Sequence, residues 1–244
     1  MTRDAGTPLP AERPGRSDIQ AVIFDLDGTL LDRRRSFERF IRHQWERFSD
    51  DSVRTVHPDL YVQTLIQLDR DGYAPRDRLF AGMIEQFGLP PDLAKDLLSD
   101  YRAGFPSACL LFPDAAETLA VLRASGLRLG LITNGSVRMQ SRKLECLALS
   151  SAFDTILISA AEGISKPDTE IFYRASERLH VDPVRAAFVG DHPEVDVAGA
   201  RAAGMFAIWR RDPAVSRAVE ADAIIDQVGD LLALLGLEPV DHAR

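Results

Sequence analysis

Short, continuously apolar runs recur along the chain, and most of them lie after residue 114. They cover residues 21–24, 127–132, 155–158, 186–189 and 205–209. Uninterrupted apolar strands, unlike alternating ones, are typical of a parallel sheet that helices cover on both faces. The pattern therefore predicts a doubly wound α/β domain with right-handed crossovers.

Helix-like segments separate these runs. Helices are expected over residues 137–147, 169–179 and 193–203. A further helix is expected to begin at Asp114, which forms a capping-box pattern with Glu117, and to end at Gly126. Strands and helices thus alternate along this part of the chain, as a doubly wound sheet requires.

Residues 34–107 follow a different pattern. Their apolar residues fall on helical faces in three stripes, without a convincing strand. The stripes begin at Phe37, Leu79 and Leu93. We therefore expect an α/β core over 19–33 and 108–244 and a helical insertion over 34–107. The large aromatic residues of the insertion are expected to form its own core.

Composition is that of an ordinary globular protein, with 45% hydrophobic and 27% charged residues. The net charge of −8 argues against a nucleic-acid partner, which would need clustered basic residues. No apolar run is long enough to span a bilayer, so no membrane partner is expected. Residues 1–18 lack the apolar segment of a secretory signal, and we expect a disordered tail there. Cys109 and Cys146 are expected to be buried or neutral thiols in a reducing compartment, and we expect the protein in the cytoplasm.

Polar residues follow the apolar runs at three predicted strand ends. Asp25 and Asp27 come directly after the run at 21–24. Because burial and mutual repulsion disfavour two ionised carboxylates side by side, either a cation lies between them or one is protonated. Ligands bind outside the carboxyl ends of parallel strands, where the strand order reverses. We expect a pocket there that collects Asp25, Asp27, Thr133, Asn134, Lys166 and Asp191.

Each of these residues has an ordinary structural explanation when it is taken alone. Thr133 and Asn134 could end a strand and form a turn, and Lys166 could be a solvated loop residue. Asp191 could cap the following helix, and Asp196 could be a surface carboxylate. All of these explanations would have to hold at once, in this order along the chain, so a shared site is the better interpretation.

The four segments, in this order, resemble the four motifs of the haloacid dehalogenase-like (HAD) hydrolase superfamily. The segments hold Asp25 to Thr29, Thr133 and Asn134, Lys166, and Gly190 and Asp191. The first matches the Asp-x-Asp-x-Thr pattern of the phosphatase branch, and the resemblance covers nearly all of the chain after about Asp18. It implies a Rossmann-like core with residues 34–107 as an α-helical cap. Many relatives have Asn where this chain has Val195, so the role of Asp196 stays open.

The resemblance implies a Mg²⁺-dependent phosphatase that hydrolyses a small phosphorylated metabolite through an aspartyl-phosphate. Asp25 would be the nucleophile. Asp27 would be general acid and then general base, with a pKa raised toward neutrality. Mg²⁺ would be bound by Asp25, Asp191 and the main-chain carbonyl of Asp27.

Three further residues would hold the phosphoryl group. The Thr133 hydroxyl and the Asn134 amide would hydrogen-bond its oxygens, and Lys166 would neutralise charge on the group as it is transferred. The run from Arg33 to Arg35 is expected to be solvated at a hinge. His192 is not expected to be a ligand, because Mg²⁺ prefers oxygen.

Two other functions fit the same residues. A phosphomutase uses the same aspartyl-phosphate chemistry but returns the phosphoryl group to a sugar. A non-catalytic binding protein could share the fold, although the intact Asp25, Asp27, Lys166 and Asp191 argue against it. Asp27 argues against a dehalogenase, because a halide leaving group needs no general acid. No feature of the sequence indicates an oligomeric state.

Overall fold

The structure, a computed structural model, describes residues 18–48, 52–72, 74–213, 215 and 218–238. The tail expected over residues 1–18 lies outside this range, except for Asp18. Within the described ranges, no helix is both long enough and apolar enough to cross a membrane.

Six parallel strands form one sheet in the order β3-β2-β1-β4-β5-β6. The strands are β1 (Ala21–Phe24), β2 (Arg128–Thr133), β3 (Thr155–Ile158), β4 (Ala186–Gly190), β5 (Phe206–Arg210) and β6 (Ala223–Ile225). Ala21 of β1 lies beside Arg128 of β2 on one side and Ala186 of β4 on the other. The predicted doubly wound α/β fold is confirmed, and the edge strand β6 has no counterpart among the predicted strands.

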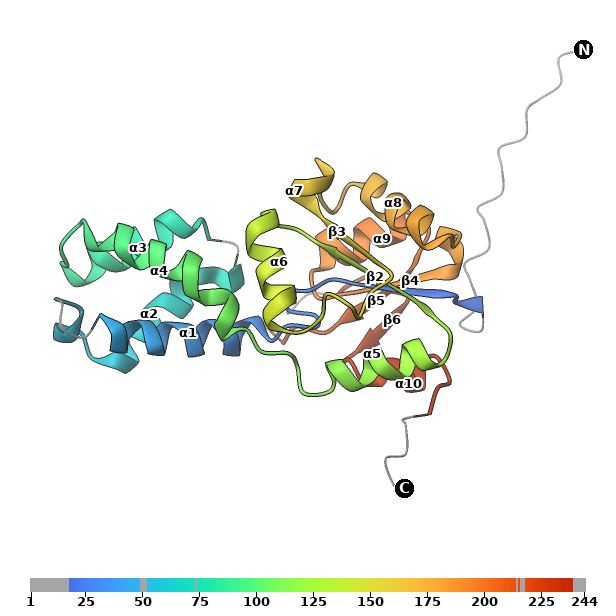
Figure 1. Cartoon of the computed structure of the whole chain (residues 1–244), viewed down its shortest axis with the longest axis horizontal. Coiled ribbons are helices and arrows are strands. Elements are labelled where there is room, and N and C mark those ends of the chain that lie inside the picture. The colour runs from blue at the N-terminus through green and yellow to red at the C-terminus, as the bar shows by residue number, and fades with distance from the viewer. Residues whose placement is uncertain (1–17, 49–51, 73, 214, 216–217, 239–244) are drawn as a thin grey trace, which may run out of the picture.

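Helices cover both faces of the sheet (Figure 1). One face holds α8 (Thr169–Leu179) and α9 (Gly199–Ala202), and the other holds α5 (Ala115–Ala124) and α10 (Asp230–Leu234). The remaining elements here are α6 (Val137–Cys146), α7 (Ser159–Glu162), the 3-10 turn η4 (Pro183–Arg185) and the π-helical turn η5 (Pro193–Ala198). Ile23 packs into the hydrophobic cluster on the α8 face, and its neighbour Phe24 packs into the cluster on the α5 face. Both faces of the strands are therefore apolar, as predicted.

The start of α5 differs from the predicted capping box. Asp114 has helical backbone angles, and its side chain makes no capping hydrogen bond to α5. Its carboxylate instead accepts a hydrogen bond from the main-chain N–H of Gly229, 115 residues further along the chain. The capping-box prediction is wrong because a long-range partner competes for the same carboxylate. The predicted stop at Gly126 is confirmed, since this residue follows α5 with a φ of +82°.

The helical insertion consists of four helices that lie beyond one end of the sheet (Figure 1). They are α1 (Arg33–Arg47), α2 (Pro58–Asp69), α3 (Arg76–Phe87) and α4 (Leu93–Ala108), with short 3-10 turns η2 (Ser52–Thr55) and η3 (Arg70–Gly72). Aromatic residues fill its centre, as predicted. Phe40 packs edge-on against Tyr101, and Tyr101 stacks on Phe105 with ring centroids 4.9 Å apart.

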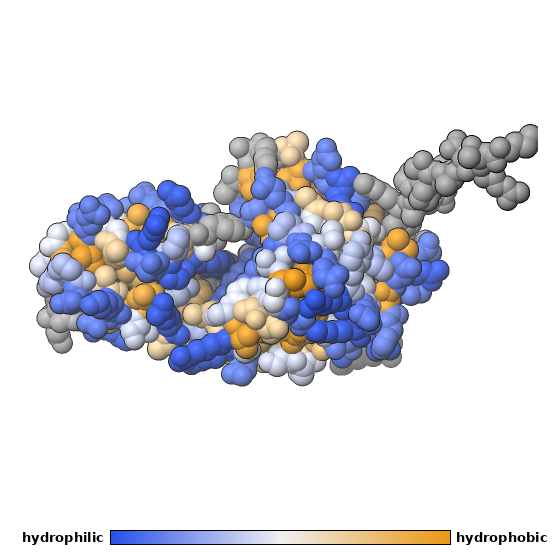
Figure 2. All heavy atoms as spheres, turned by 90° about the horizontal axis from the view of Figure 1, so that it is seen from above, coloured by the Kyte–Doolittle hydropathy of each residue, from blue (hydrophilic) through white to orange (hydrophobic). Residues whose placement is uncertain are grey.

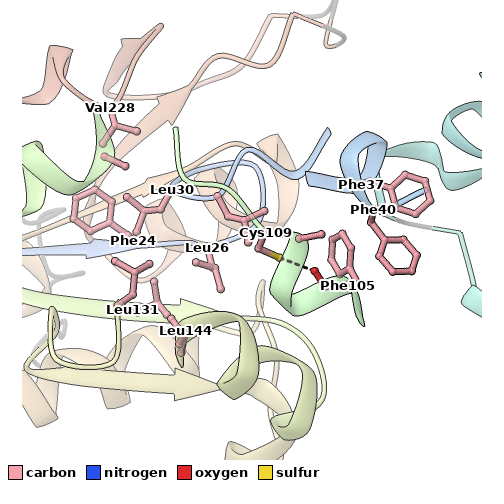
Figure 3. Close-up of a cluster of buried hydrophobic side chains, with 14 of the residues drawn as sticks. Phe24, Leu26, Leu30, Phe37, Phe40, Phe105, Cys109, Leu131, Leu144 and Val228 are labelled. Carbon is pink, nitrogen blue, oxygen red and sulfur yellow. Dashed lines mark hydrogen bonds between the residues drawn. The ribbon is translucent and has the colours of Figure 1, made fainter. Parts of the chain in front are cut away.

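The hydrophobic core is continuous from the sheet into the insertion (Figure 3). Phe24, Leu26 and Leu30 lead from β1 toward Cys109, whose thiol donates a hydrogen bond to the carbonyl oxygen of Phe105. Burial raises the pKa of Cys109 to about 12, so this thiol stays protonated and unreactive. The expectation of a buried neutral thiol is confirmed for Cys109, whereas Cys146 is exposed.

The two-sided packing predicts unequal costs for the same substitution in two strands. Ile23 in central β1 is fully buried, whereas Ile224 in edge strand β6 is 47% exposed. Ile23→Ala should lower the free energy of unfolding by about 2–5 kcal/mol, because it leaves a cavity in the core. Ile224→Ala, the matched control, should change it by no more than about 0.5 kcal/mol. Urea unfolding followed by circular dichroism measures both; equal losses would contradict the assigned layers.

Candidate active site

The site lies where the strand order reverses. β1 is flanked by β2 and β4. From β2 the sheet continues through β3 to one edge, and from β4 it continues through β5 and β6 to the other edge. The carboxyl ends of these strands face a cavity of about 1300 Å³ between the sheet and the insertion. The cavity is lined by all six residues that the sequence predicts to share a pocket, namely Asp25, Asp27, Thr133, Asn134, Lys166 and Asp191.

Three carboxylates form the centre of the cavity floor. Oxygen atoms of Asp25, Asp191 and Asp196 all lie within 4.8 Å of one another. Asp25 is fixed at the end of β1 by its N–H, which donates to the carbonyl of Val189 at 2.9 Å. Gly28 makes room for the cluster: its φ is +93°, and a Cβ there would collide with the carboxylate of Asp191.

Lys166 is a buried cation between two of these acids. Its Nζ lies 2.5 Å from Oδ1 of Asp25 and 2.7 Å from Oδ1 of Asp196, and its side chain is 1% exposed. Burial disfavours the ammonium, but Asp196 and Asp25 outweigh it and raise the pKa of Lys166 above its usual range. Lys166 is therefore not a solvated loop residue, and Asp196 is not a surface carboxylate.

The electrostatics of the cluster favour a bound cation. Burial raises the pKa of Asp25 to about 7 despite the opposing charge of Lys166. Burial, together with repulsion from Asp25 and Asp196, raises the pKa of Asp191 well above its usual range. Lys166 contacts two of the three carboxylates, those of Asp25 and Asp196, and the potential ligand atoms of the cluster are all carboxylate oxygens. This donor set fits a hard divalent ion such as Mg²⁺.

Asp27 has a different set of partners from α6. Lys143 Nζ lies 2.7 and 2.8 Å from its two carboxylate oxygens, and Gln140 Nε2 donates to Oδ2 at 2.9 Å. Burial alone would raise the pKa of Asp27. The charge of Lys143 and the hydrogen bonds from Lys143 and Gln140 outweigh burial, so the net shift of this pKa is downward. The expected rise toward neutrality is therefore wrong for the free protein, in which Asp27 is ionised.

Lys143 and Gln140 are site residues that the sequence analysis missed. They are three positions apart and so lie on one face of α6, the helix that directly follows Thr133 and Asn134. Both side chains are polar and yet buried, so they are not ordinary solvent-facing residues of the helix. The sequence offered only their polar types and helical spacing soon after a strand-end motif, because their burial is visible only in the structure.

Thr133 and Asn134 are tied to their neighbours in the cavity wall. Gln140 Nε2 donates to the Thr133 hydroxyl at 2.5 Å. The Asn134 amide donates to the main-chain carbonyl of Lys166 at 3.0 Å and accepts from its N–H at 3.1 Å. Asn134 therefore orients the loop that carries Lys166. The predicted hydrogen bonds from Thr133 and Asn134 to phosphoryl oxygens stay predictions.

The turn after β4 shows that Asp191 is not a helix cap. His192 takes that position, because its Nδ1 accepts from the N–H groups of Glu194 and Val195 at 3.2 and 3.0 Å. The N–H of His192 in turn donates to Asp196 at 3.0 Å. The carboxylate of Asp191 is thereby left to the acidic cluster, and His192 has a capping role.

The arginines at the start of the insertion divide into two kinds. Arg34 and Arg35 are exposed, as expected of a solvated hinge. Arg33 is 12% exposed, lines the cavity and forms an ion pair with the buried Asp69. The expectation of solvation is wrong for Arg33, because its carboxylate partner lies 36 residues away in sequence.

Comparisons with known proteins agree on the family. A family model described as a haloacid dehalogenase-like hydrolase matches residues 19–204. The phosphoserine phosphatase of Thermus thermophilus is 40% identical over 137 residues, 55% of this chain and 53% of that protein, so the chain spans about half its length. The glyceraldehyde 3-phosphate phosphatase of Methanopyrus kandleri is 30% identical over 195 residues, 78% of this chain and 83% of that protein.

A solved structure extends the similarity to three dimensions. The HAD phosphatase from Thermococcus onnurineus superposes with a TM-score of 0.63 at 28% identity. The match covers 91% of this chain and 100% of that one. Both the sheet and the helical insertion are therefore included in the likeness.

The contacts of Asp27 predict that Lys143 controls its ionisation. Lys143→Met should raise the pKa of Asp27, since it removes the positive charge and leaves the opposing effect of burial. A carboxyl ¹³C NMR titration of the metal-free protein, with Asp27→Asn to assign the signal, measures this pKa. Lys95→Met, at an exposed position on α4, is the matched control and should leave the pKa unchanged. An unshifted Asp27 pKa in Lys143→Met would contradict this electrostatic assignment.

Proposed function

This chain belongs to the haloacid dehalogenase-like hydrolase family, in its phosphatase branch, and we propose that it hydrolyses a small phosphorylated metabolite through an aspartyl-phosphate on Asp25, with Mg²⁺ as cofactor. The named relatives act on phosphoserine and on glyceraldehyde 3-phosphate, which are monoesters of small alcohols. We assign the same substrate class to this chain. The observation that carries the proposal is the position of Asp25, at the end of a central strand, 2.5 Å from Lys166 and within the acidic cluster.

The first step is attack on phosphorus by a carboxylate oxygen of Asp25. The new bond joins that oxygen to phosphorus, and the bond from phosphorus to the alcohol oxygen breaks. Asp27 supplies the proton that the leaving alcohol needs. Because Lys143 holds Asp27 ionised in the free protein, this role requires the contact between them to loosen when the ester binds.

The second step is hydrolysis of the aspartyl-phosphate. Water attacks phosphorus, Asp27 takes up the water's proton, and the bond between phosphorus and Asp25 breaks to release phosphate. Asp27 is ionised at this stage, because it gave its proton to the alcohol in the first step. Asp27 thereby regains the proton that it gave to the alcohol in the first step.

Charge on the phosphoryl group is balanced by the surrounding residues. Lys166 contacts Asp25, so its ammonium lies beside the carboxylate to which the phosphoryl group is transferred. The Thr133 hydroxyl and the Asn134 amide would hydrogen-bond phosphoryl oxygens at the end of β2. Mg²⁺ bound by Asp25, Asp191 and the main-chain carbonyl of Asp27 would neutralise charge on the phosphate and orient it.

We further propose that the insertion over 34–107 acts as a cap on the core formed by 19–33 and 108–244. The cavity lies between these two parts, and residues of both line it. Arg34, Arg76 and Tyr101 come from the insertion, whereas Asp25 and Asp191 come from the core. Such a cover admits small esters and excludes phosphorylated proteins.

The two aspartates of the first motif should fail in different ways. Asp25→Asn should abolish both turnover and covalent labelling, since an amide cannot form the acyl phosphate. Asp27→Asn should keep the nucleophile but lower kcat by about 10²–10⁴-fold for each proton transfer lost. Phosphate release from 4-nitrophenyl phosphate and mass spectrometry of the quenched protein measure these effects. A phosphorylated Asp25→Asn protein would refute the assignment of the nucleophile.

Removal of metal should stop the reaction without unfolding the protein. Excess EDTA should abolish phosphate release, and added Mg²⁺ should restore it, because the acidic cluster then regains its counter-charge. Circular dichroism before and after EDTA provides the control for folding. Persistent activity in EDTA would rule out the metal, and turnover that required a sugar bisphosphate activator would indicate a phosphomutase instead.

A further inference from the structure

One wall of the cavity, formed by helices of the insertion and by α6 of the core, is rich in arginine. It receives side chains from α1, α3 and α4 of the insertion and from α6 of the core. The arginines on this wall are Arg33, Arg34, Arg76, Arg102 and Arg138. The proposed chemistry on the phosphoryl group uses none of them.

Two of these arginines share one buried acid. Arg33 donates to both oxygens of Asp69, at 2.5 and 3.1 Å, and Arg76 also donates to Asp69. Asp69 is 3% exposed at its side chain, whereas Arg33 and Arg76 are 12% and 21% exposed. One carboxylate cannot neutralise two guanidinium groups, so one positive charge remains in a poorly solvated place.

The same pair is held rigidly toward the cavity. The Arg33 guanidinium lies 5.5 Å from the ring centre of Phe37, and that of Arg76 lies 5.5 Å from the ring centre of Tyr101. Arg76 also donates to the carbonyl of Gly72 at 2.6 Å. These contacts order both side chains before any ligand arrives, which lowers the entropic cost of binding an anion.

Two more arginines stand at the mouth of the cavity. Arg102 of α4 and Arg138 of α6 are exposed, and in the described part of the chain neither forms a salt bridge. Both also line a smaller hollow of about 420 Å³ next to the cavity. Figure 2 shows the hollowed region between the insertion and the core, with hydrophilic residues along its rim.

In the proposed reaction the alcohol leaves beside Asp27, and two observations connect the arginine-rich wall with Asp27. Asp27, which protonates that alcohol in the proposed reaction, is bonded to Lys143 of the same helix that carries Arg138. The positive charge of Arg33 also lowers the pKa of Asp27, so Arg33 acts on the same part of the cavity as Asp27. A neutral alcohol would leave these positive charges without a partner.

We propose that the natural substrate carries a second anionic group, a carboxylate or a second phosphate, on its alcohol portion, and that Arg76, Arg102 and Arg138 bind this group. The inference rests on the proposed phosphatase function. Guanidinium groups bind carboxylate and phosphate with the same paired hydrogen bonds, so both anions fit the wall. Specificity therefore comes from this wall, whereas the strand ends supply chemistry common to all phosphate monoesters.

Matched pairs of esters test the proposal on the unaltered protein. 3-Phosphoglycerate and glycerol 3-phosphate share a carbon chain and differ in the carboxylate. Fructose 1,6-bisphosphate and fructose 6-phosphate differ in the second phosphate. In at least one pair, kcat/KM should be roughly 10- to 100-fold higher for the member with the extra anion, as expected for hydrogen bonds to a charged group. The pair that shows the preference identifies the anion.

Variants of the wall should remove this preference selectively. Arg102→Gln combined with Arg138→Gln alters exposed side chains and should raise KM for the preferred ester about 10-fold, with kcat unchanged, because the contact is made in both ground and transition states. The ester without the extra anion should change by less than about 2-fold. Arg76→Gln should act in the same way, and Arg76→Lys should restore part of the affinity. Arg128→Gln, an exposed arginine at the opposite end of β2, is the matched control.

The outcomes separate the two hypotheses. Equal kcat/KM within both pairs, alongside turnover of 4-nitrophenyl phosphate, would overturn the inference and leave the phosphatase function standing. Wall variants that lowered kcat/KM equally for both members of a pair would overturn it too, since that result indicates a structural role. Absence of turnover with all five esters would refute the proposed function, and the inference with it.

Discussion

The ion pairs of Lys166 with Asp25 and Asp196 are the interaction on which the site depends. Three carboxylates within 4.8 Å would repel one another strongly in a buried place, and this ammonium offsets part of that repulsion. The carboxylates still outnumber the ammonium, so the cluster keeps an excess of negative charge that favours a bound cation. Asn134 stabilises the arrangement, because its side-chain amide hydrogen-bonds both the carbonyl and the N–H of Lys166.

The sheet and the residues at its edge could be predicted because the physical signals were local. Strands buried on both faces must be continuously apolar, and parallel strands bring their carboxyl ends to one edge. Asp25, Thr133 and Asp191 follow such strands directly, so their meeting in one cavity followed from topology alone. Strand β6 escaped prediction because it is three residues long and half-exposed, which leaves almost no pattern to read.

What could not be predicted depends on partners distant in sequence. Asp114 has the spacing of a helix cap in the sequence, but in the fold its carboxylate accepts a hydrogen bond from the N–H of Gly229. The pKa of Asp27 follows from Lys143, which lies 116 residues away, and so its direction is invisible in the Asp-x-Asp motif. Arg33 appeared to be one of three solvated arginines, and only the fold brings Asp69 against it. In each case local spacing identified the residue, whereas tertiary contacts decided its state.

The hydrophobic cluster that joins the sheet to the insertion limits how these parts can move and unfold. Leu30 precedes the insertion and Cys109 follows it, so both connections between the parts run through buried apolar packing (Figure 3). A wide swing would expose that surface at a cost of roughly 25 cal/mol for each Å². This packing favours small sliding movements of packed helices at the cavity mouth over a free hinge rotation. For the same reason we expect the two parts to unfold together, so that a destabilised insertion also weakens the packing near Asp25.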